Sequence, residues 1–378
     1  MRCRIFSSGG RPALLIALCL SSGSLSAAAM PAPVQQTIGR IVSKHVLIRI
    51  PQEREWLGQD AISELETCYV YMDKTTGGSL PARVLVNLSW DEPVSEANPA
   101  EATITIGMNN PAAAANSRRY LLHRAATEMA RLGLLKLSKG AAERADNRFL
   151  LEGMVEILAR EYEHSSRSLN AAWVRCHFMD RMEALSLSAL ASWERFSGGR
   201  VDQRAASPGI TFLLTCREAS NRDRLLKLFE GMGSKTLPDS LAAAFKSSAA
   251  ALESMWLQKV RGYPVTGDSA GSPDEDAPKL ERTELDPEAG APGQTLRIRL
   301  TIRDRSSDLS PDTVFFEDVG SGLVLNAQVQ PEAVRRDAYF RVLVPQDGKP
   351  GRHEYRVIAV DESGNVRIWQ GVYPVNSK

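Results

Sequence analysis

The sequence predicts an α+β protein that continues into an all-β module at its C-terminus. Short alternating apolar runs occur near the start of the 378-residue chain, and helical apolar spacing dominates its middle. Alternation returns after a segment rich in Gly, Pro, Ser and acidic residues. Strands followed by helices are typical of a sheet packed on one side of a helical body. Because the chain is much longer than the usual ~150 residues of one domain, we expect two domains.

The chain begins with the pattern of a secretory signal peptide, which we assign to residues 1–29. Arg2, Arg4 and Arg11 precede an apolar run, and a serine-rich stretch then leads to the small residues Ala27–Ala29. The apolar run is far shorter than the ~20 residues that a membrane-spanning helix needs. No later segment is long and apolar enough to span a bilayer. We therefore expect an exported protein, periplasmic or secreted, with no transmembrane segment after the signal peptide.

The cysteine count and the balanced charge limit which disulfides and which binding surfaces we expect. Removal of the leader leaves Cys68, Cys176 and Cys216, and an odd number cannot all pair within one molecule. Cys176 and Cys216 fall in adjacent predicted helices, so one disulfide is permitted in an oxidising compartment; we favour the alternative of three buried thiols. With 46 basic and 45 acidic residues, the chain shows no sign of a nucleic-acid or anionic-membrane surface.

The first domain, residues 34–263, opens with strands. Val46, Ile48 and Ile50 alternate along a short run that Pro51 stops, which predicts a strand. Residues 84–88 and 103–107 predict two more. Between the first two runs, apolar residues at spacings of three to seven predict a helix, and they are Trp56, Ile62, Leu65, Tyr69 and Met72.

The rest of this domain is almost wholly helical from Ser117 onward, and Ser117 is expected to be the N-cap of the first of these helices. Near the end of the domain, apolar residues recur at helical intervals and are expected in the core. They are Leu241, Phe245, Leu252, Trp256 and Val260.

Residues 264–290 predict a linker and residues 291–378 a β-sandwich. The linker is rich in Gly, Pro, Ser and acidic residues and lacks apolar periodicity. Five alternating runs follow, at 296–302, 314–317, 323–329, 339–344 and 355–360, so we expect a sandwich of seven strands. Asp361 and Asn365 could contact calcium, but a hairpin turn needs no ion, and we favour the plain turn.

Two positions four residues apart on one predicted helix outline a candidate site. Helical i, i+4 spacing lets two imidazoles converge on one zinc ion, and a glutamate directly after the first histidine then acts as general base. Here the two positions hold Thr127 and Arg131. The acidic residues are Glu128 and, on the next predicted helix, Glu152. Threonine is a poor zinc ligand and arginine stays positively charged, so we expect neither a metal nor another cofactor.

These residues and those that follow them carry a family resemblance. Together with the segment from Glu152-Gly153 to Glu156, they make residues 41–262 similar to the peptidase MA-like domain of the gluzincin metallopeptidases, with a degenerate zinc site. A distal acidic residue and Trp256 resemble that family's closing segment. The hairpin ending at Asn365 resembles the last hairpin of bacterial immunoglobulin-like domains.

The resemblance implies a gluzincin-like domain in which Thr127, Glu128, Arg131 and Glu152 are vestiges of a peptidase site. It also implies a cleft between the sheet and the helical body, suited to an extended peptide that adds along a strand edge. If the helices keep the family geometry, the Arg131 guanidinium lies where zinc would, and it forms a structural ion pair with Glu152.

Several alternatives stay open for these residues. Glu128, Glu152 and Glu156 could be solvated faces of two helices, as most helical glutamates are. A displaced metal site of His123, Glu152 and a later histidine, His164 or His177, is a less favoured alternative, because no histidine pair has i, i+4 spacing. Adjacency of Cys176 and His177 in sequence does not place the two groups for proton transfer.

The function expected from these patterns is that of an exported, noncatalytic pseudopeptidase that binds a protein or an extended peptide. Two alternatives are kept. One is a divergent zinc-dependent peptidase or hydrolase with a displaced metal site, or a metal-free enzyme that uses Glu128 or Glu152 with Arg131. The other is a structural envelope spacer.

Overall fold

The computed structural model describes most of the chain after the predicted leader. The described ranges are 37–92, 94–109, 113–114, 116–164, 167–190, 201–218, 221–267, 277–303, 313–329, 337–344, 349–361 and 364–377. The signal peptide predicted at residues 1–29 and the first residues of the predicted domain, 34–36, lie outside these ranges. Residues from Thr37 to Lys378 belong to one compact unit.

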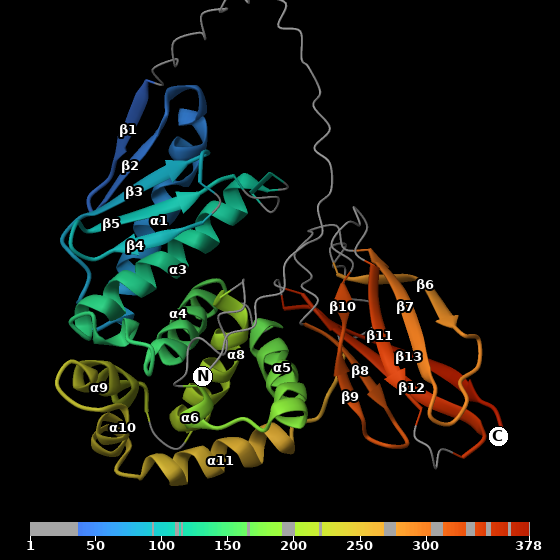
Figure 1. The fold of residues 1–378 in the computed structure, drawn as a ribbon. Helices are drawn as coiled ribbons and strands as arrows, with labels where there is room; N and C mark the ends of the chain where they lie inside the picture. The colour runs from blue at the N-terminus through green and yellow to red at the C-terminus, as the bar shows by residue number, and fades with distance from the viewer. Residues whose placement is uncertain are drawn as a thin grey trace, which may run out of the picture. The chain divides into compact units, whose positions relative to one another are not determined.

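The first part of this unit is a five-stranded sheet of order β1-β2-β3-β5-β4 (Figure 1). The strands are β1 (Ile38–Val42), β2 (Val46–Pro51), β3 (Val84–Ser89), β4 (Glu96–Asn98) and β5 (Thr103–Gly107). The central β2, β3 and β5 are parallel, whereas β1 and β4 pair antiparallel at the two edges. The three strands predicted from alternation are confirmed, and the two edge strands were not predicted.

One face of this sheet is buried in the main core. Ile48, Val86 and Ile104 lie side by side in register and are fully buried. The predicted helix between the first two runs is α1 (Glu55–Thr75), which buries Leu65 and Met72 in the same core. Trp56, by contrast, is exposed near the start of the helix.

Helices make up the rest of the first domain. They are α3 (Ser117–Leu137), α4 (Arg148–Tyr162), α5 (Arg167–Glu183), α6 (Leu187–Leu190), α8 (Val201–Glu218), α9 (Arg222–Met232), α10 (Leu237–Phe245) and α11 (Ala249–Arg261). The five apolar residues predicted for the core of the last two helices are all buried. Among the described helices, none combines the length and the apolar character needed to cross a bilayer.

The predicted start of α3 is wrong by one residue. The N-cap is Asn116, whose side-chain oxygen accepts a hydrogen bond from the backbone N–H of Arg119 at 3.0 Å. The Ser117 hydroxyl instead donates to the carbonyl of Ala113 at 2.9 Å. Both residue types cap helices well, and asparagine ranks at least as high as serine.

Helices α4 and α8 touch through their backbones. Gly153 of α4 faces Gly209 of α8, and a Cβ added to either glycine would overlap main-chain atoms of the other helix. Small residues at a crossing let two helices approach this closely, because side chains normally keep helix axes 8–10 Å apart. The glycine that follows Glu152 therefore has a packing role, and it fixes the distance between α4 and the rest of the helical body.

The C-terminal region is a sandwich of two four-stranded sheets, of orders β10-β11-β7-β6 and β13-β12-β8-β9 (Figure 1). The strands are β6 (Lys279–Asp286), β7 (Thr295–Arg303), β8 (Val314–Asp318), β9 (Val324–Asn326), β10 (Gln328–Val329), β11 (Asp337–Leu343), β12 (Gly351–Val360) and β13 (Val366–Val375). Ile298 and Val342 of one sheet share a core with Phe316 and Val357 of the other.

Two predictions for this region are wrong. The segment 264–290 is not wholly a linker, because β6 lies within it and pairs with β7, so the described residues form eight strands rather than seven. A register shift between Leu280 and Arg282 breaks the two-residue alternation that would have revealed the strand. The run 323–329 is divided at Ala327 between β9 and β10, which belong to different sheets.

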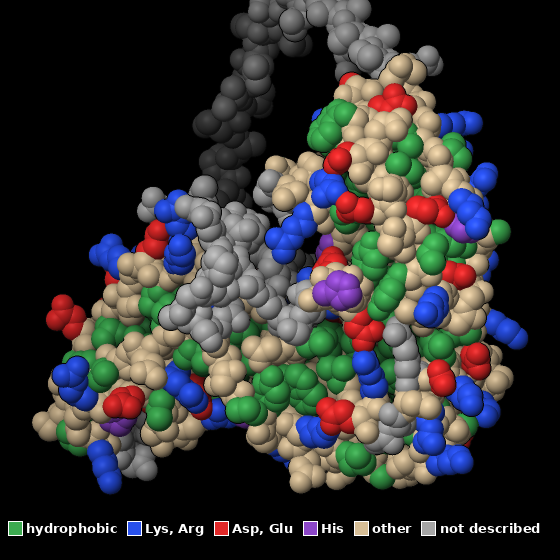
Figure 2. All heavy atoms as spheres, turned by 180° about the vertical axis from the view of Figure 1, so that it is seen from behind, with side chains coloured by type: hydrophobic (Ala, Val, Ile, Leu, Met, Phe, Trp, Pro, Cys, Tyr) green, Lys and Arg blue, Asp and Glu red, His purple; other side chains and the backbone are tan. Residues whose placement is uncertain are grey.

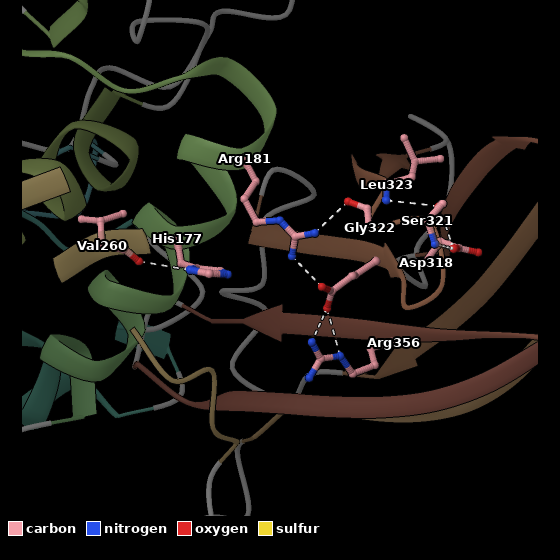
Figure 3. A network of polar contacts seen from close by, with 9 residues as sticks. His177, Arg181, Val260, Asp318, Ser321, Gly322, Leu323 and Arg356 are labelled. Carbon is pink, nitrogen blue, oxygen red and sulfur yellow. Dashed lines mark hydrogen bonds and ion pairs between the residues drawn. The ribbon is translucent and has the colours of Figure 1, made fainter. Parts of the chain in front are cut away.

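Helix α5 packs directly on the second sheet of the sandwich. The rings of Phe178 and Phe315 stack with centroids 5.0 Å apart in a small apolar cluster. Beside it, Arg181 donates to Glu317 at 2.5 Å, and Arg356 of the neighbouring strand donates to the other oxygen of the same carboxylate at 2.9 Å (Figure 3). A carboxylate held between two arginines thus joins the helix to the sandwich, and we call these three residues the junction triad.

Candidate functional site

Arg131 of α3 lies between two carboxylates at the candidate site. Its terminal nitrogens Nη1 and Nη2 donate to the two oxygens of Glu152 on α4, at 2.6 and 2.7 Å. Its Nε donates to Glu128 Oε2, one turn earlier on α3, at 3.0 Å. Two parallel charge-assisted bonds to one carboxylate form the strongest geometry that an arginine makes. The ion pair predicted between Arg131 and Glu152 is confirmed.

Both carboxylates are buried. The side chain of Glu128 is 1% exposed and that of Glu152 is 5% exposed, while Arg131 is 17% exposed. The alternative that these glutamates are solvated helix faces is therefore wrong for Glu128 and Glu152. Because an unpaired buried charge is very unfavourable, the guanidinium is what makes two buried carboxylates tolerable at this place.

Two further arginines lie close to the two carboxylates. Arg124 Nη2 is 3.6 Å from Glu128 Oε1, and Arg148 Nε is 3.9 Å from Glu152 Oε1. The sequence analysis missed both, although each arginine lies four residues before its glutamate, the spacing at which helical ion pairs form. The two glutamates thus face three arginines, and the immediate surroundings carry excess positive charge.

The family resemblance implies a zinc ion here, and the residues present do not fit one. The Thr127 hydroxyl donates to the backbone carbonyl of His123 at 2.9 Å, within its own helix. Arg131 brings a permanent positive charge between the acidic residues, and both oxygens of Glu152 already accept hydrogen bonds from it. A divalent cation needs lone pairs that face it, and this arrangement offers cationic donors instead.

A second charged cluster adjoins the first along α3 and α4. His123 Nδ1 lies 2.7 Å from Glu163 Oε1, and Arg160 bonds Glu156 at 2.7 Å and Glu163 at 3.2 Å. Burial would raise the pKa of Glu156, but the Arg160 and His123 charges outweigh it and lower the pKa to about 2. Burial also opposes ionisation of Glu163, whose pKa is nevertheless lowered by His123 and Arg160. Glu156 is thus ionised and paired.

The residues of the displaced metal site are directed elsewhere. His123 pairs with Glu163 rather than Glu152, and His164 is exposed just beyond α4. His177 Nδ1 faces the carbonyl of Val260 at 3.1 Å (Figure 3). Across the part of the chain that the structure describes, no group of three or more His, Cys, Asp or Glu side chains is placed to hold a metal ion.

Cys68, Cys176 and Cys216 are buried, and none of them forms a disulfide. The favoured prediction of three buried thiols is confirmed, and Cys176 and Cys216 do not pair. Burial raises the pKa of both thiols to about 12, and the Thr211 hydroxyl lies 3.3 Å from Cys176. A thiol that stays protonated is a poor nucleophile, so the adjacency of Cys176 and His177 builds no catalytic pair.

The turn between Asp361 and Asn365 is held by its own side chains. The Asp361 carboxylate accepts hydrogen bonds from the backbone N–H of Asn365 at 2.7 Å and from its side-chain amide at 2.6 Å. The Asp361 carbonyl accepts a bond from Arg175 of α5 at 2.5 Å. The favoured prediction of a plain hairpin turn accounts for these contacts, and the turn also contributes to the contact with α5.

Comparison with known proteins places the chain in no family. No family model matches it, and no curated protein matches its sequence. The solved structures with a distant likeness to it include the following three.

The M60 catalytic domain of Clostridium perfringens ZmpB with its CBM51 domains is 9% identical over 89% of this chain and 44% of that one, with a TM-score of 0.26. The DNA glycosylase AlkC of Pseudomonas fluorescens is 12% identical over 85% and 99%, with a TM-score of 0.22. Neutral ceramidase of Pseudomonas aeruginosa is 11% identical over 46% and 37%, with a TM-score of 0.17. The chain thus spans less than half the length of two of the three.

Proposed function

We propose that this chain is an exported, noncatalytic pseudopeptidase that acts by binding a protein or an extended peptide. The observation that carries the noncatalytic part is the bidentate bond from Arg131 to Glu152, closed on the other side by Glu128. These bonds engage the two carboxylates that a hydrolase would need for catalysis. What supports the gluzincin ancestry is the order of these residues along α3 and α4, together with the position of Gly153 directly after Glu152.

The electrostatics of the site argue against general-base catalysis. A general base must accept a proton near the working pH, so enzymes raise the pKa of a catalytic carboxyl by burial or by a second acid. Glu128 instead accepts a hydrogen bond from Arg131 Nε at 3.0 Å and lies 3.6 Å from Arg124, so arginine donors face its carboxylate. The metal-free alternative is therefore less favoured, because arginine donors face both glutamates.

The binding part of the proposal rests on the first sheet. Its edge strands β1 and β4 end the ladder, and an edge strand offers unpaired backbone groups to which an extended peptide can add. The sandwich beyond it belongs to a type of module often used for interaction or spacing, which is an analogy of fold alone. An immunoglobulin-like assignment and a periplasmic or secreted location belong to the same proposal.

The proposal is tested with purified protein that lacks residues 1–29. We expect no stoichiometric zinc by elemental analysis after incubation with zinc, and no chelator-sensitive cleavage of casein. We also expect the immobilised chain to capture a partner from the exported fraction that the free chain displaces in a saturable manner. Casein cleavage abolished by both a chelator and Glu128→Gln would overturn the noncatalytic assignment, and the lack of any saturable partner would overturn the binding function.

A structural spacer is the second candidate, and the junction triad favours it. The contact of Glu317 with Arg181 and Arg356 gives α5 and the sandwich a fixed attachment, as a spacer of defined length would need. This candidate predicts no saturable partner for either part of the chain, so the same capture experiment separates the two.

A further inference from the structure

The register of the first sheet places two arginines side by side on its outer face. Arg40 of β1 lies directly opposite Arg49 of β2, and Arg49 lies beside Asn87 of β3. The alternate residues, Ile41 and Ile48, form the buried face. Arg40 and Arg49 are both exposed, so they belong to the face that the core does not cover.

These two charges are uncompensated. Like charges directly opposite each other in an antiparallel pair are destabilising. Among the described residues, no ion pair or hydrogen bond is formed by either guanidinium, and the nearest acid in the same row is Glu96, beyond Asn87 and Thr105. Arg118, an exposed arginine on α3, is by contrast paired with Asp60 and Glu64.

Apolar side chains flank the arginine on the edge strand. Ile38 and Val42 are 60% and 59% exposed, and they lie two residues before and after Arg40, on the same face. Figure 1 shows β1 as the outermost strand of the sheet. The opposite edge, β4, is only three residues long and carries Glu96 and Asn98 outward, which is how proteins blunt an edge. β1 is the edge that remains open.

We propose that β1 binds an extended acidic peptide as an added strand. Main-chain hydrogen bonds join the peptide to β1, a carboxylate of the peptide lies against Arg40 and Arg49, and apolar residues two positions to either side of it lie against Ile38 and Val42. The recognised pattern is therefore apolar, any, acidic, any, apolar. This inference rests on the proposed binding function and gives it a surface and a ligand class.

A second copy of this chain is excluded as the occupant by the same charge. Arg40 is the central residue of β1, so a symmetric antiparallel pairing of two β1 strands would set Arg40 against Arg40 with both Arg49 side chains nearby. Four positive charges without an acid would meet at that interface. A charged side chain on an edge strand is a known device against edge-to-edge association, and it leaves an acidic strand as the complementary partner.

The probe is a fluorescein-labelled peptide with the core Ile-Thr-Glu-Thr-Val, titrated with the mature chain and followed by anisotropy. Arg40→Glu is expected to weaken binding about fivefold or more, since it replaces an exposed attraction with an exposed repulsion. The same variant should gain affinity for the matched peptide with Lys in place of Glu. Arg352→Glu, an exposed reversal on β12 of the sandwich, is the control and should bind the probe as wild type does.

Three outcomes would overturn the edge assignment. They are equal binding of the acidic probe by wild type and Arg40→Glu, no gain for the Lys peptide, and equal binding of a scrambled peptide or polyglutamate, which would show charge attraction without strand addition. If Arg40→Glu still captures the exported partner as wild type does, the edge is wrong and the binding function stands. If wild type captures no partner, the binding function itself fails.

Discussion

Arg131 and Glu152 face each other across α3 and α4 with both terminal nitrogens of one bonded to both oxygens of the other, at 2.6 and 2.7 Å. The pair links α3 to α4. Without Arg131, Glu128 of α3 and Glu152 of α4 would be buried carboxylates without their main partner. The pair is also the reason that the chain, although its residue order resembles that of a peptidase, offers no set of ligands to zinc.

Removal of the central cation is expected to destabilise the chain. Arg131→Met leaves Glu128 and Glu152 buried without their main partner, which typically costs about 3 to 5 kcal/mol. Chemical denaturation at pH 7 measures the change. The matched control is Arg118→Met on the same helix, because Arg118 also pairs with two acids but is exposed; that change should cost about 1 kcal/mol or less. Equal effects of the two substitutions would contradict the account.

The stability of the chain should depend on the ionisation of Glu156. Its pKa in the folded chain is about 2, below its ordinary value of 4.5, so the folded state binds the proton less readily than the unfolded state does. The carboxylate therefore adds stability above about pH 4.5, and this contribution is lost as the pH falls towards 2. Unfolding midpoints in urea at pH 7, 5 and 3 should fall less steeply for Glu156→Gln than for wild type. Parallel profiles would show that the pairing with Arg160 does not matter.

The close approach of α4 and α8 should make both of its glycines intolerant of a methyl group. Gly153→Ala and Gly209→Ala each force the helices apart, and overpacking of this kind costs about 1 to 3 kcal/mol or more. Gly231→Ala in α9, where an added Cβ meets only ordinary contacts, is the control and should stabilise or be neutral. A thermal midpoint of Gly153→Ala equal to that of wild type would refute the backbone contact.

The junction triad should make α5 and the sandwich unfold together. Burial opposes ionisation of Glu317, but hydrogen bonds from Arg181 and Arg356 lower its pKa, so the group is a paired carboxylate. Glu317→Ala leaves the two arginines together, and the expected loss is about 1.5 to 3 kcal/mol. Differential scanning calorimetry should then show broadening or splitting of the transition. Glu354→Ala, an exposed acid on β12, should leave the trace unchanged.

Alternation and helical spacing predicted the parts of the fold that are buried on one face or all round. The run of Val46, Ile48 and Ile50 and the core positions around Trp256 follow simple periods, because one side of each element faces the core. β6 was not predicted because a bulge interrupts its alternation. β1 was not predicted because its outer residues Ile38 and Val42 are apolar yet exposed. Local pattern does not reveal which strand ends a sheet.

The central pair of the site could be predicted from sequence, whereas its surroundings could not. The family resemblance predicted the pairing of Arg131 with Glu152. Helical i, i+4 spacing also indicates Arg124 and Arg148, which lie four residues before Glu128 and Glu152. The cluster of His123 with Glu163 depends on how α3 and α4 pack, so no spacing within one helix indicates it.

On the face seen in Figure 2, acidic and basic side chains are interspersed, as the balanced composition indicates.

The most direct measurement is the zinc content of the Thr127→His, Arg131→His double variant beside wild type, by elemental analysis of folded protein after dialysis. If Arg131 occupies the place of an ancestral zinc ion, two imidazoles at i, i+4 with Glu152 complete a three-ligand site, and we predict about one zinc ion per chain in the variant and none in wild type. Near-ultraviolet circular dichroism checks that the variant is folded. A folded double variant without zinc, or wild type that binds zinc stoichiometrically, would contradict the account.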